Sequence, residues 1–305
     1  MTAAGLALSL VCALPGAPLQ AMEKVAIRSL DGKLELSAYW FPVSTTSATT
    51  SATGQAQPAV ISLHGCGGML NSNGTPVAGA ARDAGHFNAE NIHWLALDSF
   101  SARGVKSICE IPSARRSIHE EDRREDVYAA LQWLARQPGV DAKRIAVLGR
   151  SHGAQTVLST IDGSDPRVRA QPLLPGAAIA LYPGCTKFNA IRSYELAVPL
   201  SLMSGELDDW TPARPCVQLH DKLTRSGKVM RFDIKVYPGS YHGFDGTAPV
   251  RVRTGLGISR GSAHVGGNAE AREQAHARIF EFLSSQWQMT LLLTHEERLK
   301  GRRRN

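Results

Sequence analysis

The sequence predicts a single α/β domain built on a mostly parallel sheet flanked by helices, with an antiparallel pair of strands at its amino end. Short apolar runs alternate along the chain with longer segments of helical pattern, and parallel strands need such helical connections. The 305 residues can bury a large core, and neither a repeat nor a linker divides them. The composition, 43% hydrophobic and 20% charged, is that of an ordinary globular protein.

The amino-terminal segment, residues 1–21, resembles a signal peptide. An apolar run at residues 6–14 is followed by small residues that suit cleavage near Ala21, although the run has no positively charged flank. The run is too short to cross a bilayer. We therefore expect no membrane span and an exported protein, periplasmic or secreted, whose folded domain covers residues 22–290.

Positive charge is concentrated at the carboxyl end of the chain. The formal net charge is +7, but five positive charges fall within residues 298–305, in a basic tail that we place at residues 291–305. Because the folded part is then only mildly basic, we expect no nucleic-acid partner.

Hydrophobic patterning predicts the elements of the first half in order. Two strands in residues 23–41 flank Asp31 and Gly32, a strong hairpin turn signal. A polar low-complexity loop follows at residues 44–57. The next expected elements are strands at 59–63 and 92–97, a helix at 119–137 that begins with acidic residues, and a strand at 144–148.

The second half continues the alternation of strands and helices. A helix is expected directly after the strand at 144–148. Strands then follow at 177–182, 198–203 and 231–237, and helices at 212–226 and 268–288. Residues 249–268 are rich in glycine and have no periodic pattern, so we expect a long excursion there.

Residues 149–153, with the sequence G-R-S-H-G, lie between a predicted strand and a predicted helix. This is the context of a nucleophile elbow, in which two glycines permit a sharp turn and the central serine stands above the sheet edge. Ser151 would then lie at the positive end of the following helix. Alone, the pentapeptide fits an ordinary strand-to-helix turn equally well.

A second glycine-rich turn, the glycine loop at residues 64–68 (H-G-C-G-G), follows an earlier strand. Acyl transfer needs two backbone N–H groups aimed at the developing oxyanion. We expect one from His152, directly after the serine, and the other from Cys66 or Gly67. The alternative is a plain glycine turn with His64 in the core.

A serine nucleophile needs a histidine base and a carboxylate that orients it, and both groups follow strands later in the chain. His242 comes after the strand at 231–237, next to a glycine. Asp208 is favoured as the acid over Asp209 and Glu206 because it lies three residues after Gly205. Asp209 offers a cap for the helix at 212–226.

The other polar residues of these loops have structural interpretations. Asp98 and Arg103 are expected to pair and hold their loop, and the side chain of His152 is expected to line the pocket wall. No histidine and carboxylate cluster has zinc spacing, so we expect neither metal nor cofactor. No catalytic role is assigned to the four remaining histidines after the elbow, His220, His264, His276 and His295.

Together, the glycine loop, the elbow, residues 205–212 and residues 241–244 resemble the dienelactone hydrolase family of the α/β-hydrolase superfamily over residues 23–287. The resemblance implies a triad of Ser151, Asp208 and His242 that opens lactones or esters without a metal. Typical members carry cysteine as the nucleophile, whereas position 151 is serine. This difference favours a general carboxylic-ester hydrolase acting on a small ester or lactone.

Four cysteines remain once the leader, which contains Cys12, is removed, and they resemble those of an exported branch of that family. Cys185 and Cys216 follow consecutive strands near the acid, so we hypothesise a disulfide between them. Cys66 and Cys109 would then form a second. Four cysteines allow three connectivities, and free thiols are the alternative.

Two other functions use the same predicted features. A peptidase or an acyltransferase would need the same triad and differ only in leaving group or acceptor. A catalytically silent binding protein on the same fold would usually have lost one member of the triad. An elbow serine argues against a haloalkane dehalogenase, which has aspartate at that position.

Overall fold

The computed structural model describes residues 22–43, 56–227 and 230–289. The predicted leader with Cys12, most of the predicted polar loop at 44–57 and the basic tail lie outside these residues. Within the described part, no helix combines the length and the apolar character needed to cross a membrane.

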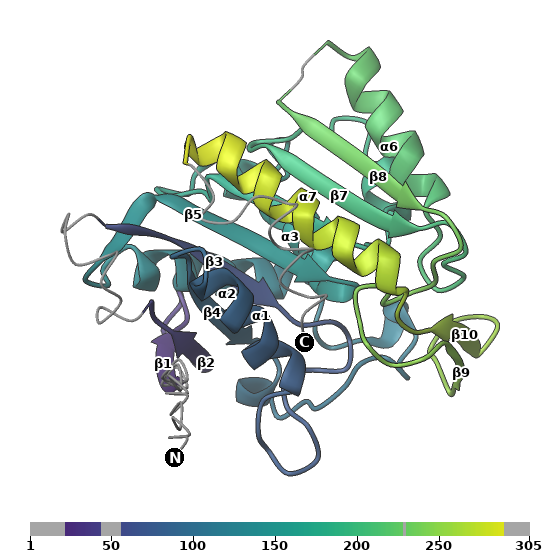
Figure 1. The fold of residues 1–305 in the computed structure, drawn as a ribbon, viewed down its shortest axis with the longest axis horizontal. Coiled ribbons are helices and arrows are strands. Elements are labelled where there is room, and N and C mark those ends of the chain that lie inside the picture. The colour runs from purple at the N-terminus through teal and green to yellow at the C-terminus, as the bar shows by residue number, and fades with distance from the viewer. Residues whose placement is uncertain (1–21, 44–55, 228–229, 290–305) are drawn as a thin grey trace, which may run out of the picture.

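A twisted sheet of eight strands forms the centre of the molecule, in the order β1-β2-β4-β3-β5-β6-β7-β8 (Figure 1). The pairs β1–β2 and β2–β4 are antiparallel and every later pair is parallel, which confirms the predicted fold class. The strand bounds are β1 Glu23–Arg28, β2 Glu35–Phe41, β3 Gln57–Leu63, β4 His93–Asp98, β5 Val140–Arg150, β6 Ala177–Leu181, β7 Leu200–Gly205 and β8 Phe232–Tyr237.

Helices cover both faces of this sheet (Figure 1). The longer ones are α1 (Ala78–Asn88), α2 (Glu120–Leu134), α3 (His152–Thr160), α6 (Arg214–Arg225) and α7 (Ala269–Trp287). Helices α1 and α7 pack on one face, whereas α2, α3 and α6 share the core on the other. The inner strands are mostly apolar because both of their faces are buried, as is usual in parallel sheets.

Helix α1, a hairpin in the glycine-rich excursion and the short helices α4 (Pro166–Arg169) and α5 (Thr186–Ala190) were not predicted. Helix α1 lies in a stretch that carries polar side chains even on its buried side, at Asp83 and Asn88, so its apolar stripe is weak. The glycine-rich excursion contains a hairpin of β9 (Arg251–Thr254) and β10 (Ser262–Val265). Both strands are short, and β9 is mostly exposed while β10 is mostly half-buried, so neither has the regular alternation that predicts a strand.

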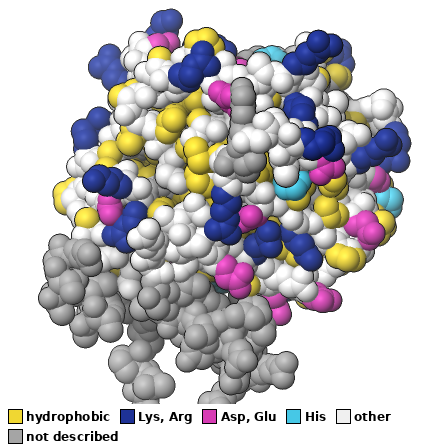
Figure 2. All heavy atoms as spheres, turned by 90° about the horizontal axis from the view of Figure 1, so that it is seen from above, with side chains coloured by type: hydrophobic (Ala, Val, Ile, Leu, Met, Phe, Trp, Pro, Cys, Tyr) yellow, Lys and Arg dark blue, Asp and Glu magenta, His cyan; other side chains and the backbone are white. Residues whose placement is uncertain are grey.

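The structure joins the cysteines in the two hypothesised pairs, Cys66 with Cys109 and Cys185 with Cys216. The first bond links the loops that follow β3 and β4, and the second links the loop after β6 to the first turn of α6. From above the view of Figure 1, basic side chains occur across the visible face, and acidic side chains lie beside several of them (Figure 2).

Candidate active site

Ser151 lies in a strained turn between β5 and α3. Its backbone has φ 54° and ψ −118°, a conformation that costs a non-glycine residue on the order of 1–3 kcal/mol. Both flanking glycines are required by close packing. A Cβ atom on Gly149 would lie 2.2 Å from the carbonyl oxygen of Gly153, and one on Gly153 would lie 2.4 Å from that of Leu63. The turn therefore has the geometry of a nucleophile elbow.

The structure brings Ser151, His242 and Asp208 into one hydrogen-bonded chain. His242 Nε2 lies 2.9 Å from Ser151 Oγ, and its Nδ1 lies 2.8 Å from Asp208 Oδ2. Both His242 and Asp208 are buried, and they follow β8 and β7 at the sheet edge where the elbow lies. This arrangement allows the imidazole to take a proton from the hydroxyl while the carboxylate holds the opposite ring nitrogen.

Further contacts orient Asp208 and His242. Asp208 Oδ1 accepts hydrogen bonds from the backbone N–H groups of Trp210 (2.9 Å) and Thr211 (2.8 Å). The Thr211 hydroxyl lies 3.0 Å from both Asp208 Oδ2 and His242 Nδ1. The rings of Tyr182 and Trp210 pack against the imidazole, each with a centroid separation of 4.7 Å. No motif in the sequence points to these neighbours.

The two alternative acids bind other partners. Asp209 accepts hydrogen bonds of 2.9 Å from both the backbone N–H and the Nδ1 of His264 on β10, and Arg260 lies 3.3 Å from it. The expected helix cap is wrong, because α6 begins after Ala213 without a side-chain cap. The Asp209 carboxylate binds His264 of the β9–β10 hairpin instead. Glu206 accepts a hydrogen bond from the exposed backbone N–H of Gly239.

The glycine loop passes beside the elbow. A Cβ atom on Gly65 would lie 3.4 Å from Ser151 Cβ, so the backbone of the loop runs close to the serine side chain. Cys66 ties the loop to Cys109, and its carbonyl accepts a hydrogen bond of 2.9 Å from the Ile108 N–H. The candidate N–H donors of Cys66 and Gly67 thus belong to a loop that is tied, by this disulfide and this hydrogen bond, to the segment around Cys109.

The imidazole of His152 does not line a pocket wall as expected, because it is 3% exposed and faces α2. Its Nδ1 lies 2.8 Å from Nη1 of Arg123, a buried side chain that the sequence analysis missed. Burial, and then the charge of Arg123, lower the pKa of His152 well below its usual range, so the ring is neutral. A signal was present, since Arg123 precedes Val127 by four residues on the apolar stripe of α2.

The expected pair of Asp98 and Arg103 is also wrong. Arg103 makes two hydrogen bonds, of 2.8 and 2.9 Å, to the buried carboxylate of Asp126 on α2. Asp98 instead accepts hydrogen bonds from the backbone N–H groups of Phe100 and Ser101 and stabilises its own turn. The Asp126 carboxylate binds the Arg103 guanidinium through two hydrogen bonds, one to each oxygen. Asp98, in the same loop as Arg103, does not form such a bidentate pair.

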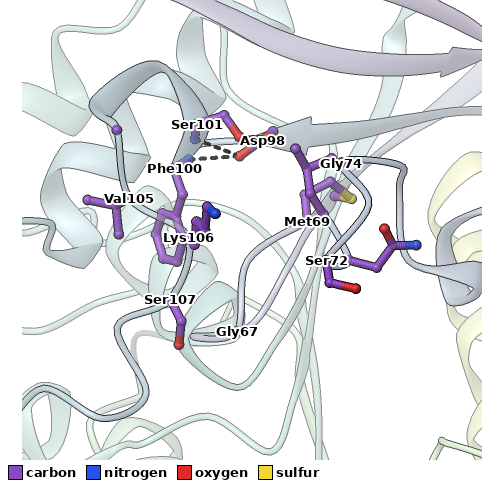
Figure 3. Close-up of a pocket in the computed structure, with 13 residues that line it drawn as sticks. Gly67, Met69, Ser72, Gly74, Asp98, Phe100, Ser101, Val105, Lys106 and Ser107 are labelled. Carbon is purple, nitrogen blue, oxygen red and sulfur yellow. Dashed lines mark hydrogen bonds between the residues drawn. The ribbon is translucent and has the colours of Figure 1, made fainter.

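A cavity of about 490 Å³ lies between the loops that follow β3 and β4 (Figure 3). It includes Gly67 of the glycine loop, so it begins beside a candidate oxyanion donor. Met69, Phe100 and Val105 give it apolar walls, and Lys106 is the cation among its lining residues. Among the described residues, no group of three or more metal-binding side chains is placed to hold an ion.

Comparisons with known proteins agree with this architecture. The sequence pattern of the dienelactone hydrolase family matches residues 104–286. A search of curated protein sequences finds no match. Among solved structures, a protein assigned as a dienelactone hydrolase from Klebsiella pneumoniae is 15% identical, with a TM-score of 0.60 over 87% of this chain and 98% of its own.

Two further solved structures share the fold. Esterase 2 from Thermogutta terrifontis, phosphorylated by paraoxon, is 16% identical, with a TM-score of 0.59 over 89% of this chain and 95% of its own. A puromycin-hydrolyzing peptidase from Mycobacterium tuberculosis is also 16% identical, with a TM-score of 0.62 over 89% of this chain. The match covers only 40% of the peptidase.

Proposed function

The chain belongs to the dienelactone hydrolase family, and we propose that it is a serine hydrolase that cleaves a small carboxylic ester or lactone through an acyl-enzyme. One observation carries the proposal, namely the continuous hydrogen-bonded chain from Ser151 through His242 to Asp208. Serine, base and acid come from three separate loops, and each lies within hydrogen-bonding distance of the next.

In the proposed reaction, Ser151 Oγ attacks the carbonyl carbon of the ester while His242 Nε2 takes the hydroxyl proton. Asp208 keeps the proton of Nδ1 in place and stabilises the imidazolium that forms. The protonated His242 then gives its proton to the leaving alkoxide, and an acyl-Ser151 ester remains. Water, deprotonated by His242, attacks this ester, and the acid leaves as the serine is regenerated.

The negative charge of each tetrahedral intermediate needs two backbone N–H donors. We assign one to His152, the first residue of α3, where the helix dipole also favours negative charge. The other comes from Cys66 or Gly67 in the glycine loop. A lactone would follow the same steps, except that its leaving alkoxide, once protonated, stays part of the acyl group, so hydrolysis of the acyl-Ser151 ester releases a single hydroxy acid.

The proposed substrate is a small molecule. A cavity of about 490 Å³, within the usual range for ligand pockets, lies beside Gly67, and the triad residues are not among its lining residues. We further propose that the protein is exported, with residues 1–21 as its leader. The two disulfides, Cys66–Cys109 and Cys185–Cys216, support this because such bonds persist in oxidising compartments.

The test compares hydrolysis of short-chain p-nitrophenyl esters by the protein lacking residues 1–21 and by its Ser151→Ala variant. Ser159→Ala is the matched control, a buried serine on α3 whose hydroxyl lies near Arg124. A fluorophosphonate probe followed by peptide mass spectrometry locates the reactive serine. We expect turnover by the wild type and the control, none by Ser151→Ala, and a label on Ser151.

A folded wild type that neither turns over any ester nor takes the label would refute the proposal. The same fold would then serve as a binding protein without catalysis. Turnover of p-nitroanilide substrates in preference to esters would instead favour a peptidase on the same triad.

A further inference from the structure

Arg123 is a fully buried arginine that takes no part in the proton transfers above. It lies on α2 and is 0% exposed. Its guanidinium contacts the two segments that carry the candidate oxyanion donors. Nη1 lies 2.8 Å from His152 Nδ1, and Nη2 donates a hydrogen bond of 2.7 Å to the carbonyl oxygen of His64.

These two segments also pack directly against each other. A Cβ atom on Gly153 would lie 2.4 Å from the carbonyl oxygen of Leu63 and 2.7 Å from that of His64. The start of α3 therefore touches the start of the glycine loop, and the fork of Arg123 binds one group on each side. A planar guanidinium holds two acceptors at a set separation, which a flexible ammonium does not.

The surroundings of the guanidinium hold it in place. Phe100 stacks under it, with the guanidinium carbon 5.1 Å from the ring centroid. Asp126, Asp98 and Glu120 are close enough to attract its charge, but no hydrogen bond joins Arg123 to any of these three carboxylates, and Asp126 is bound to Arg103. Burying a cation that is hydrogen-bonded to no carboxylate costs stability. The placement of Arg123 against two neutral acceptors beside the elbow therefore needs an explanation other than stability.

We propose that Arg123 is a positioning residue that sets the spacing between the two halves of the oxyanion hole, the N–H of His152 and the N–H groups of the glycine loop. The inference rests on the proposed function and deepens it. Its consequence is that the side chain acts on the transition state, where the oxyanion is present, rather than on binding of the ester.

The test uses a pair of substrates, a phenyl ester and the matching thionoester, in which sulfur replaces the carbonyl oxygen. Sulfur is the weaker hydrogen-bond acceptor, so the ratio of kcat/KM for ester over thionoester reports how well the hole is formed. Arg123→Met should lower kcat for the ester about 10²-fold with KM nearly unchanged. The ratio should fall towards that of the uncatalysed reaction.

Arg124→Met is the matched control because Arg124 is the next residue on α2 and is equally buried, at 1% exposed. Its guanidinium binds Asp165 at 2.9 Å and Glu125 at 3.3 Å, and no hydrogen bond links it to the glycine loop or to His152. We expect this variant to lose stability in a thermal melt and to keep the wild-type ratio.

A second pair of variants tests the proposal without altering Arg123. His152→Leu removes the acceptor for Nη1 and leaves the backbone N–H in place, so it should lower the ratio. His152→Gln keeps an acceptor and should restore most of it. Wild-type ratios in both Arg123→Met and His152→Leu would overturn the inference, as would an equal fall in Arg124→Met. A wild type inactive on every ester would instead be a failure of the proposed function.

Discussion

The assignment of Asp208 as the acid of the triad makes the most direct prediction, which compares Asp208→Asn with Asp209→Asn. In Asp208→Asn, the surrounding hydrogen bonds allow only one orientation of the side-chain amide. Asp208 Oδ1 accepts two backbone N–H groups, from Trp210 and Thr211, so the amide oxygen must take that position. The amide NH₂ then occupies the position of Oδ2, 2.8 Å from His242 Nδ1.

This orientation reverses the tautomer of the imidazole. Because the amide donates to Nδ1, the ring proton moves to Nε2 and points at Ser151 Oγ, 2.9 Å away. The ring then has no free nitrogen to receive the serine proton. For a triad, this change lowers kcat about 10⁴-fold, which corresponds to about 5 kcal/mol of transition-state stabilisation.

Asp209→Asn should have a much smaller effect, since Asp209 binds His264 and Arg260 of the β9–β10 hairpin region rather than His242. We expect kcat to stay within about threefold of wild type, because exposed ion pairs contribute little. The assay is steady-state hydrolysis of p-nitrophenyl acetate, with circular dichroism to verify folding. Asp208→Asn retaining a tenth of the wild-type kcat, or a collapse in Asp209→Asn instead, would show that the acid is misassigned.

Two further predictions concern the disulfides and pH. The variant Cys66→Ser/Cys109→Ser opens a loop of 43 residues, so the free energy of unfolding measured in urea titrations should fall by about 4 kcal/mol. This variant should also have a lower kcat, because the disulfide no longer holds the glycine loop. The matched variant Cys185→Ser/Cys216→Ser should lose a similar amount of stability and keep kcat, so equal effects on kcat would count against this reasoning. Burial lowers the pKa of His152 well below its usual range, so the unfolded chain binds more protons below about pH 6.5. The free energy of unfolding should therefore fall from pH 7 to pH 5, and it should fall less in His152→Gln, which keeps only the similarly buried His64 with a strongly lowered pKa. An equal pH dependence in both proteins would refute that contribution.

The strand and helix pattern was largely predictable because it depends on local periodicity. Strands with both faces buried are continuous apolar runs, and glycines mark the turns at Gly32 and at the elbow. Helix α1 and the β9–β10 hairpin were not predicted, because their polar or exposed residues give little periodic hydrophobic signal.

The candidate triad was also visible as three motifs at strand ends, in the order serine, acid, histidine. Spacing after Gly205 favoured Asp208 over Asp209 but did not exclude Asp209. Only the folded chain pairs Asp208 with His242 and Asp209 with His264, because that distinction depends on which way two adjacent side chains point from one turn.

The sequence by itself determined the alternation of elements, the elbow at Ser151 and the residue types needed for acyl transfer. The tertiary structure alone decided the partners of buried charges. Arg103 contacts Asp126 rather than Asp98, and Arg123 joins the glycine loop to α3. The physical reason is that backbone conformation follows from neighbours in the chain, whereas a buried charge binds whichever polar group the packing of distant segments brings within reach.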